Sequence, residues 1–313
     1  MKIVLLESLG VPQEQIDGHR ARLEAMGHSF EAFEKNADPA VQRERSRGAD
    51  VIMLANMPLD ASVVRESENL KLIDVAFTGV DHIPVQEARE KGIAVCNASG
   101  YATQAVAELC VSLMIDLLRH VPETQERCRS QKTKDGLIGR LLSGKTVGIV
   151  GAGAIGKRVA ALCAAFGCHV IAYSRSRVTD AAIKEQVSLE ELLARADIVS
   201  LHCPLTEETR GMIGAEQLAA MKPTAFLINT ARGALIDEPA LIKALQSGQI
   251  AGAGLDVQQT EPPAEDSPLY TLENVVLTPH MGWRGLETRR RLVSMVGENI
   301  RAFCAGSPIN RIV

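Results

Sequence analysis

Short apolar runs rich in β-branched residues alternate with helical patterns along the whole chain. A first series predicts strands at Ile3–Leu6, Val51–Ala55, Leu72–Phe77 and Ala94–Asn97. A second series predicts strands at Thr146–Val150, Val170–Ser174, Ile198–His202, Phe226–Asn229, Gly252–Val257 and Val275–Thr278. Segments between them, such as Gln13–Met26 and Ala181–Ala194, have the pattern of helices. This alternation predicts an α/β protein with two doubly wound parallel sheets, one for each series.

A long helical pattern, Thr103–His120, separates the two series. Val106, Leu109, Leu113 and Leu117 recur at helical spacing, and further apolar residues between them widen the apolar face beyond one stripe. Such a helix is expected to be buried between layers or between subunits. The polar stretch Glu123–Asp135 that follows is expected to be an exposed connection or a dimerising arm.

Composition and charge exclude several classes of protein. A length of 313 residues favours about two domains, and the net charge of −4 comes without the basic stripe of a nucleic-acid binder. No stretch approaches the roughly 18 apolar residues of a membrane helix, and Ile3–Leu6 is too short for a signal peptide. The seven cysteines lack metal-ligand spacing, which favours reduced thiols in the cytoplasm and no metal.

A glycine-rich turn lies at a strand-to-helix junction. Gly151-Ala152-Gly153-Ala154-Ile155-Gly156 follows the strand Thr146–Val150 and precedes the helical pattern Val159–Phe166. Glycines there permit a tight turn and bring a dinucleotide pyrophosphate close to backbone N–H groups at a helix N-terminus. A purely structural turn is the alternative, which this context disfavours.

The next strand ends without the acidic residue that binds the ribose of NAD. Ser174-Arg175-Ser176-Arg177 stands there instead. A carboxylate would repel a 2′-phosphate, whereas a guanidinium can pair with it through two hydrogen bonds. The hypothesis is therefore that NADP is preferred and NAD is possible. The alternative is that both arginines are solvated charges and the protein does not discriminate.

Three segments at predicted strand ends supply a guanidinium, a carboxylate and an imidazole, namely Arg232, Glu261 and His280. Reduction of a 2-oxo acid needs a cation for the carboxylate and a proton for the carbonyl oxygen. Arg232 can bind the carboxylate and polarise the carbonyl. His280 can give and retake the proton, and Glu261 can stabilise the imidazolium. The alternatives are a helix-end charge for Arg232 and a loop charge for Glu261.

The order of these motifs resembles the D-isomer-specific 2-hydroxyacid dehydrogenases over nearly the whole chain. The motifs are the glycine turn, Asn229-Thr230-Ala231-Arg232-Gly233, Asp256-Val257 with Glu261-Pro262, and Thr278-Pro279-His280. Thr78-Gly79-Val80-Asp81-His82 is similar to the substrate loop of that family, and Leu205–Gly211 is similar to its cofactor-covering segment.

The resemblance implies a fold and an assembly. It implies a flavodoxin-like substrate domain of residues 1–98 plus 287–313, with a Rossmann dinucleotide-binding domain, residues 99–286, inserted between them. It also implies a homodimer built largely through the cofactor domains.

The residue chemistry and the resemblance together indicate the site residues, although Ser174 stands where the family has an acidic residue. The catalytic residues would be Arg232, Glu261 and His280, and the substrate-binding residues Asn56, Thr78, Gly79, Arg232 and Trp283. The cofactor-binding residues would be Thr103, Gly151, Gly153, Ala154, Ile155, Gly156, Ser174, Arg175, Ser176, Cys203, Pro204, Thr209, Thr230, Ala231 and Asp256, with Asp256 on the nicotinamide carboxamide. Trp283 and Phe77-Thr78-Gly79 suit the glycerate and hydroxypyruvate branch, so glyoxylate or hydroxypyruvate is the expected substrate.

Two other functions remain open. Transcriptional corepressors that resemble these dehydrogenases bind the dinucleotide as a signal, although this chain has no added tail or basic patch for a partner. Formate and phosphite dehydrogenases also use an arginine-rich anion pocket, but no additional cation lies near Asn56 or Thr78 in the sequence.

Overall fold

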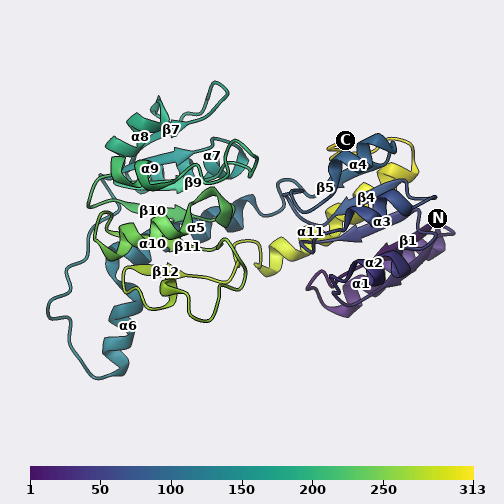
Figure 1. Cartoon of the computed structure of the whole chain (residues 1–313), viewed down its shortest axis with the longest axis horizontal. Helices are drawn as coiled ribbons and strands as arrows, with labels where there is room; N and C mark the ends of the chain where they lie inside the picture. Colours follow the sequence, from purple (N-terminus) through teal and green to yellow (C-terminus); the bar gives the residue numbers. More distant parts are fainter. The chain divides into compact units, whose positions relative to one another are not determined.

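The computed structural model describes residues 1–313 and divides into two compact units (Figure 1). The first unit contains Met1–Ala102 and Arg284–Val313, and the second contains Thr103–Trp283. The sequence predicts the domain boundaries at 98/99 and 286/287, a few residues from those of the structure. Each unit has its own parallel sheet, and the chain passes between the units twice.

The first unit is built on a five-stranded parallel sheet in the order β2-β1-β3-β4-β5, the order of flavodoxin-like folds. Its strands are β1 (Lys2–Leu5), β2 (Ser29–Ala32), β3 (Val51–Leu54), β4 (Leu72–Val75) and β5 (Ala94–Asn97). Its helices are α1 (Gln13–Ala25), α2 (Pro39–Ser46), α3 (Ala61–Glu66), α4 (Val85–Glu90) and α11 (Leu286–Cys304). The apolar pattern did not predict β2, because this edge strand buries only Phe30.

The second unit is built on a seven-stranded parallel sheet in the order β12-β11-β10-β9-β6-β7-β8. Its strands are β6 (Thr146–Val150), β7 (His169–Tyr173), β8 (Glu185–Gln186), β9 (Ile198–Leu201), β10 (Phe226–Asn229), β11 (Gly252–Leu255) and β12 (Val275–Leu277). Its helices are α5 (Thr103–Arg119), α6 (Val121–Arg129), α7 (Ala154–Ala165), α8 (Leu189–Arg195), α9 (Ala215–Ala220) and α10 (Glu238–Gln246). The strand order reverses between β6 and β9, where dinucleotides bind in sheets of this kind.

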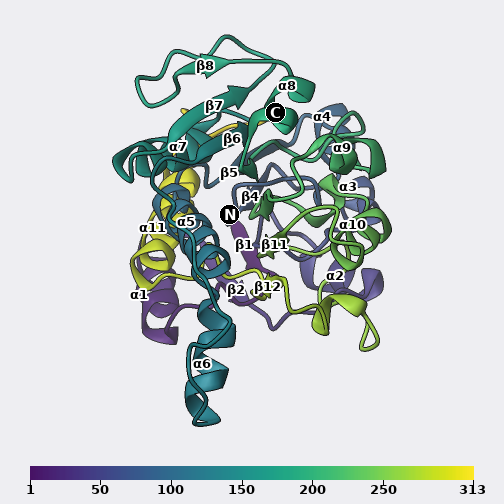
Figure 2. The same ribbon diagram turned by 90° about the vertical axis from the view of Figure 1, so that its left-hand side faces the viewer.

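The helix α5 is buried within its own unit, as its wide apolar face predicted. It packs against α7 and against β10 and β11. Figure 2 shows α5 next to α7 and continuing into α6. A Cβ built on Gly254 of β11 would lie 3.1 Å from the Cβ of Leu113, so the helix and the strand are in close contact. The expected polar connection after α5 contains α6, which has no buried residue.

The predicted helix Ala181–Ala194 is wrong in its first half. Residues 185–186 form β8, which pairs with β7, and helix α8 begins only at Leu189. Ser188 caps this helix by accepting a hydrogen bond from Glu191 N at 3.1 Å. The residues before Leu189 have helical spacing in the sequence but do not form a helix. The free sheet edge beside β7 offers their backbone groups hydrogen-bond partners instead.

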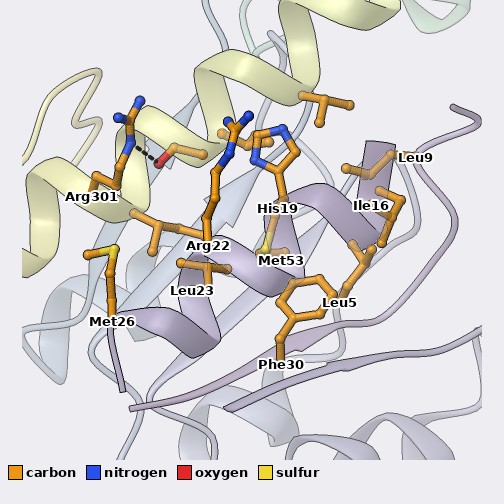
Figure 3. Close-up of a pocket in the computed structure, with 14 residues that line it drawn as sticks. Leu5, Leu9, Ile16, His19, Arg22, Leu23, Met26, Phe30, Met53 and Arg301 are labelled. Atoms are coloured by element: carbon orange, nitrogen blue, oxygen red, sulfur yellow. Dashed lines mark hydrogen bonds between the residues drawn. The ribbon is translucent and has the colours of Figure 1, made fainter. Parts of the chain in front are cut away.

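A small cavity of about 40 Å³ lies in the first unit between α1, α11 and the sheet (Figure 3). Its lining is mainly apolar, and His19, Arg22 and Arg301 supply polar atoms. Burial and the two nearby arginine charges lower the pKa of His19. None of the predicted substrate-binding residues lines this cavity. Among the helices of the structure, none combines the length and the apolar character needed to cross a membrane.

Candidate active site

The glycine turn after β6 is required by close packing. Gly151 has φ 99°, and a Cβ there would lie 2.7 Å from the backbone N of Cys203 after β9. A Cβ on Gly156 in α7 would overlap the Gly151 carbonyl oxygen. A Cβ on Gly153, the residue that precedes α7, would meet no atom within 4 Å. The turn is therefore tight on its protein side and open at the helix N-terminus, which fits a dinucleotide pyrophosphate.

Two further loops of the second unit lie at the same carboxyl end of the sheet as this turn. Thr209 Oγ1 donates to the Pro204 carbonyl at 2.7 Å and accepts from Thr206 N at 2.8 Å, which closes the segment after β9. Thr230, directly after β10, is 9% exposed, and its buried hydroxyl lies beside the thiol of Cys110 in α5.

The loop after β7 begins beside the glycine turn, because Gly151 N donates to the Tyr173 carbonyl at 2.8 Å. Arg175 Nη1 lies 3.5 Å from Glu208 Oε2 in the segment after β9. Burial raises the pKa of the Cys203 thiol, and the charge of Arg175 partly offsets this effect. Arg175 therefore lies on the side of the sheet where the glycine turn and the loop after β9 meet.

Asn229 shapes the turn that bears Arg232. This fully buried side chain donates to the Arg232 carbonyl at 2.9 Å and accepts from Ala231 N at 3.0 Å. A Cβ on Gly233 would overlap the Gln258 carbonyl, so the turn lies directly against the segment that leads to Glu261. Arg232 and Glu261 are thereby brought together by backbone packing rather than by proximity in the sequence.

His280 and Glu261 form a short contact, with Nδ1 of the imidazole 2.8 Å from Oε2 of the carboxylate. Burial opposes the ionisation of Glu261. The hydrogen bond and charge of His280, the N–H of Gln258 and the charge of Arg232 outweigh burial and hold the pKa of Glu261 below its ordinary value. An anionic carboxylate thus lies against one nitrogen of the imidazole, and proton exchange with a substrate would use the other nitrogen, Nε2.

Asp256 orients the loop that carries His280. Its carboxylate is 1% exposed and accepts from Thr278 Oγ1 at 2.6 Å, Met281 N at 2.7 Å and Gly282 N at 2.8 Å. His280 N donates to the Asp256 carbonyl at 2.8 Å, and His280 has φ 50°. The sequence suggested that Asp256 contacts the nicotinamide. In the structure its carboxylate accepts three hydrogen bonds from the loop of His280, so Asp256 also positions that loop.

The predicted substrate residues of the first unit lie after strands β3 and β4. Glu7, only 3% exposed, accepts from Ala55 N at 2.8 Å and Met57 N at 2.7 Å, on either side of Asn56. Asn97 Nδ2 donates to the Thr78 carbonyl at 2.7 Å. Sequence reasoning missed the roles of Glu7 and Asn97. An acid directly after the apolar run Ile3–Leu6 was the available signal, because a carboxylate at a buried strand end needs partners.

The remaining histidine and cysteine near the glycine turn show no sign of catalytic activation. Burial lowers the pKa of His202 to about 4, and its Nε2 lies 2.9 Å from Ser200 Oγ. Burial raises the pKa of Cys203, which disfavours the thiolate needed for nucleophilic attack. Trp283, the last residue of the second unit, is half-buried. No group of three or more histidine, cysteine or acidic side chains could hold a metal ion.

Known proteins resemble this chain over most of its length. The family model "D-isomer specific 2-hydroxyacid dehydrogenase, NAD binding domain" matches residues 111–282. A glyoxylate reductase of Korarchaeum cryptofilum is 43% identical over 272 residues, which are 84% of this chain and 82% of the relative. A glycerate dehydrogenase of Methylorubrum extorquens is 39% identical over 292 residues, 90% of this chain and 91% of the relative.

Solved structures show the same likeness over the full length. An acyclic imino acid reductase, Bsp5, in complex with NADPH and D-Arg has a TM-score of 0.93 and 32% identity, covering 100% of both chains. The TT0316 protein of Thermus thermophilus has a TM-score of 0.91 and 38% identity, also covering 100% of both chains. With its two parallel sheets, its glycine turn and the matched NAD-binding domain, this chain belongs to the D-isomer-specific 2-hydroxyacid dehydrogenases, a family of nicotinamide-dependent oxidoreductases.

Proposed function

We propose that the protein reduces glyoxylate or hydroxypyruvate to the corresponding 2-hydroxy acid, with Arg232, Glu261 and His280 as its catalytic residues. The observation that carries this proposal is the 2.8 Å contact between His280 and Glu261, with Arg232 close enough to influence the carboxylate. These groups lie in the unit that also bears the glycine turn. The names of the similar proteins, glyoxylate reductase and glycerate dehydrogenase, support the substrate class.

Each catalytic side chain has one task in this proposal. Arg232 binds the substrate carboxylate through paired charge-assisted hydrogen bonds and polarises the carbonyl. His280 donates a proton to the carbonyl oxygen as that oxygen gains negative charge, and later regains a proton from solvent. Glu261 stabilises the imidazolium before transfer. A bound reduced nicotinamide supplies the hydride that reaches the carbonyl carbon. Asn56, Thr78, Gly79 and Trp283 are proposed substrate contacts.

For the cofactor, we propose NADP in preference to NAD. The residues that would hold it are those named from the sequence: Thr103, Gly151, Gly153, Ala154, Ile155, Gly156, Ser174, Arg175, Ser176, Cys203, Pro204, Thr209, Thr230, Ala231 and Asp256. The serine at position 174 and the guanidinium of Arg175 beside the glycine turn favour a 2′-phosphate. The imino acid reductase of similar fold was solved with NADPH, which supports the same choice.

The deciding experiment is an absorbance assay of reduced cofactor consumption with NADPH or NADH and a series of 2-oxo acids. Turnover of glyoxylate or hydroxypyruvate should fall by about a hundredfold or more in His280→Ala, because general acid catalysis typically contributes at least that much. His169→Ala is the matched control, since His169 also pairs with a glutamate, Glu185, at 3.1 Å but at the amino end of β7. Arg232→Ala should lose turnover as well.

Other outcomes would redirect the proposal. Tight cofactor binding without reduction of any 2-oxo acid would contradict it and favour a dinucleotide-sensing protein. Oxidation of formate or phosphite would favour those dehydrogenases. Turnover that appears only when ammonium or an amine is added would favour imine reduction, the activity in the name of the similar imino acid reductase.

A further inference from the structure

The loop after β7, residues 174–178, is fastened by a single side chain on the edge strand of the sheet. Gln186 Nε2 donates to the carbonyls of Ser174 and Ser176, each at 2.9 Å. Its Oε1 accepts from Val178 N at 2.9 Å. One exposed amide therefore makes three hydrogen bonds to the backbone of the loop that carries Arg175 and Arg177.

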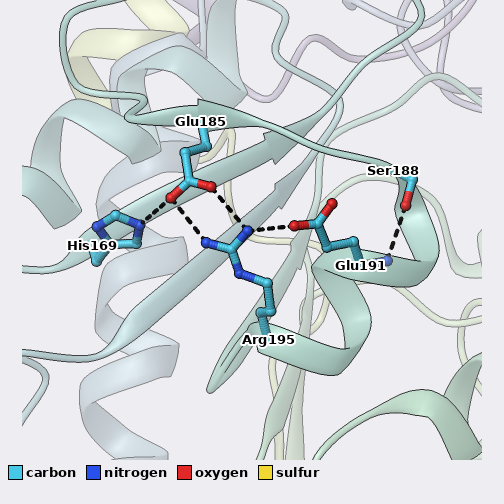
Figure 4. A network of polar contacts seen from close by, with 5 residues as sticks. All are labelled: His169, Glu185, Ser188, Glu191 and Arg195. Carbon is cyan, nitrogen blue, oxygen red and sulfur yellow. Dashed lines mark hydrogen bonds and ion pairs between the residues drawn. The ribbon is translucent and has the colours of Figure 1, made fainter.

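The strand that bears Gln186 is itself anchored. Residues 185–186 form β8, which pairs in parallel with Ile171 and Ala172 of β7. Figure 4 shows the neighbouring Glu185 between His169 and Arg195, at 3.1 Å from the His169 imidazole and 2.9 Å from both terminal nitrogens of Arg195. Although β8 is only two residues long, it is held by the sheet on one side and by α8 through Arg195.

Peptide geometry determines which backbone groups the loop exposes on the side away from Gln186. In a trans peptide the carbonyl and the following N–H point in opposite directions. Because Gln186 holds the carbonyls of Ser174 and Ser176, the N–H groups of Arg175 and Arg177 point away from Gln186. Neither of these N–H groups has a hydrogen-bond partner in the protein. Backbone donors and guanidinium groups are the combination that binds a phosphate.

The loop also lies where the adenosine end of a dinucleotide is expected. Gly151 N of the glycine turn donates to the Tyr173 carbonyl, directly before Ser174. Arg175 reaches toward the segment after β9, where Glu208 lies 3.5 Å away and where its charge influences Cys203. In sheets of this kind the residue after the second strand is adjacent to the ribose.

We propose that Gln186 is a specificity-determining residue for the cofactor, because it holds the 174–178 backbone in the conformation that binds an adenosine 2′-phosphate. Gln186 acts as a positioning residue and does not itself touch the cofactor. The inference rests on the proposed NADP preference and extends it to a residue outside the binding loop. Without the amide, the loop is more mobile before the cofactor binds and loses conformational entropy when it orders around the 2′-phosphate. This loss weakens the binding of NADP⁺ and not that of NAD⁺, which has no 2′-phosphate.

The test compares the dissociation constants of NADP⁺ and NAD⁺ by calorimetry in the full-length wild-type protein and three variants. Gln186→Leu keeps the size of the side chain and removes all three hydrogen bonds. It should weaken NADP⁺ binding by about fivefold or more and NAD⁺ binding by less than about twofold. Gln217→Leu is the matched control, since Gln217 also accepts from a backbone N–H, that of Gly214, but caps α9 instead. In Gln217→Leu, the ratio of the dissociation constants of NADP⁺ and NAD⁺ should equal that of the wild type.

Arg175→Gln separates failure of this inference from failure of the proposed function. If Arg175→Gln lowers the preference for NADP⁺ and Gln186→Leu does not, the role of Gln186 is overturned and the phosphate site stands. Equal weakening of both cofactors in Gln186→Leu also overturns it, because that result indicates a general structural role. If neither variant changes the ratio, the NADP preference itself is wrong. Turnover of 2-oxo acids by the wild type tests the reaction independently of these ratios.

Discussion

At the scale of the residue, the second unit contains two histidine–glutamate pairs with different surroundings. His280 and Glu261 meet at 2.8 Å beside Arg232, and His169 and Glu185 meet at 3.1 Å beside Arg195. Arg195 binds Glu185 with two nitrogens, so that carboxylate is neutralised within a surface network. Arg232 instead donates to the Ala231 carbonyl and acts on Glu261 through its charge. Only the first pair lies on loops at the carboxyl ends of the strands.

Glu261→Gln should lower kcat for reduction by about tenfold or more while changing KM less, because the protonated imidazole loses its anionic partner. Steady-state kinetics with glyoxylate would measure both constants. Glu185→Gln, the corresponding change in the surface pair, should leave kcat unchanged. A wild-type kcat in Glu261→Gln would contradict the role given to this carboxylate.

At the scale of the element, α11 is joined to the sheet of the first unit by a buried polar network. Asn299 Nδ2 donates to Asp74 Oδ1 of β4 at 2.8 Å and to the Asn97 carbonyl of β5 at 3.0 Å. Asn310 Nδ2 donates to Asn299 Oδ1 at 2.9 Å. Asp74 is fully buried, and its Oδ2 has no partner. Burial raises the pKa of Asp74 to about 8, although the Asn299 hydrogen bond acts in the opposite direction.

This raised pKa makes stability depend on pH. In the unfolded chain Asp74 loses its proton near its ordinary pKa of about 3.9, whereas the folded protein keeps it until about pH 8. Between these two pKa values the folded state binds more protons than the unfolded state. The stability that protonated Asp74 contributes is therefore lost as pH rises from about 4 to about 8. Urea midpoints from circular dichroism should fall over this window in the wild type and fall less in Asp74→Asn. Asp17→Asn, at an exposed position, is the control, and an unchanged slope in Asp74→Asn would refute the assignment.

At the scale of the whole molecule, the second unit exposes apolar residues around α6. Ile138 and Leu141 are 84% and 70% exposed, and Val121 of α6 is 41% exposed. A cavity of about 320 Å³ lies beside them, lined by the end of α5, the start of α6 and the edge strand β12. Apolar side chains gathered at a cavity are typical of an interaction surface. This surface supports the homodimer that the sequence predicts. The homodimer and a cytoplasmic location are both proposals.

A wild-type dimer in light scattering should become monomeric when Ile138 and Leu141 are both changed to aspartate, because two buried charges at an interface would lack partners. Ile309→Asp is the control, since Ile309 is 42% exposed in the first unit. Monomeric wild-type protein, or a double variant that stays dimeric, would rule out this surface as the dimer interface.

Local pattern in the sequence determined the second-unit sheet from β6 to β12 apart from β8, the buried helix α5, the glycine turn and the candidate trio of Arg232, Glu261 and His280. These features are written in contiguous residues, because apolar runs, glycine spacing and strand-end polar groups need no distant partner to be recognised. The edge strands β2 and β8 required tertiary structure, since what makes them strands is a neighbouring strand and not an apolar alternation of their own.

The same distinction applies to the positioning residues. The sequence predicts that Asp256 and Asn56 lie at strand ends, but only the folded chain shows that Asp256 binds the loop of His280 and that Glu7 holds the backbone around Asn56. Gln186 likewise lies eight residues beyond the loop that it fastens. Sequence alone determined which chemical groups this protein has available, because side-chain chemistry is local. Tertiary structure decided which backbone each of them holds, because a hydrogen bond joins residues that are close in space and distant in the chain.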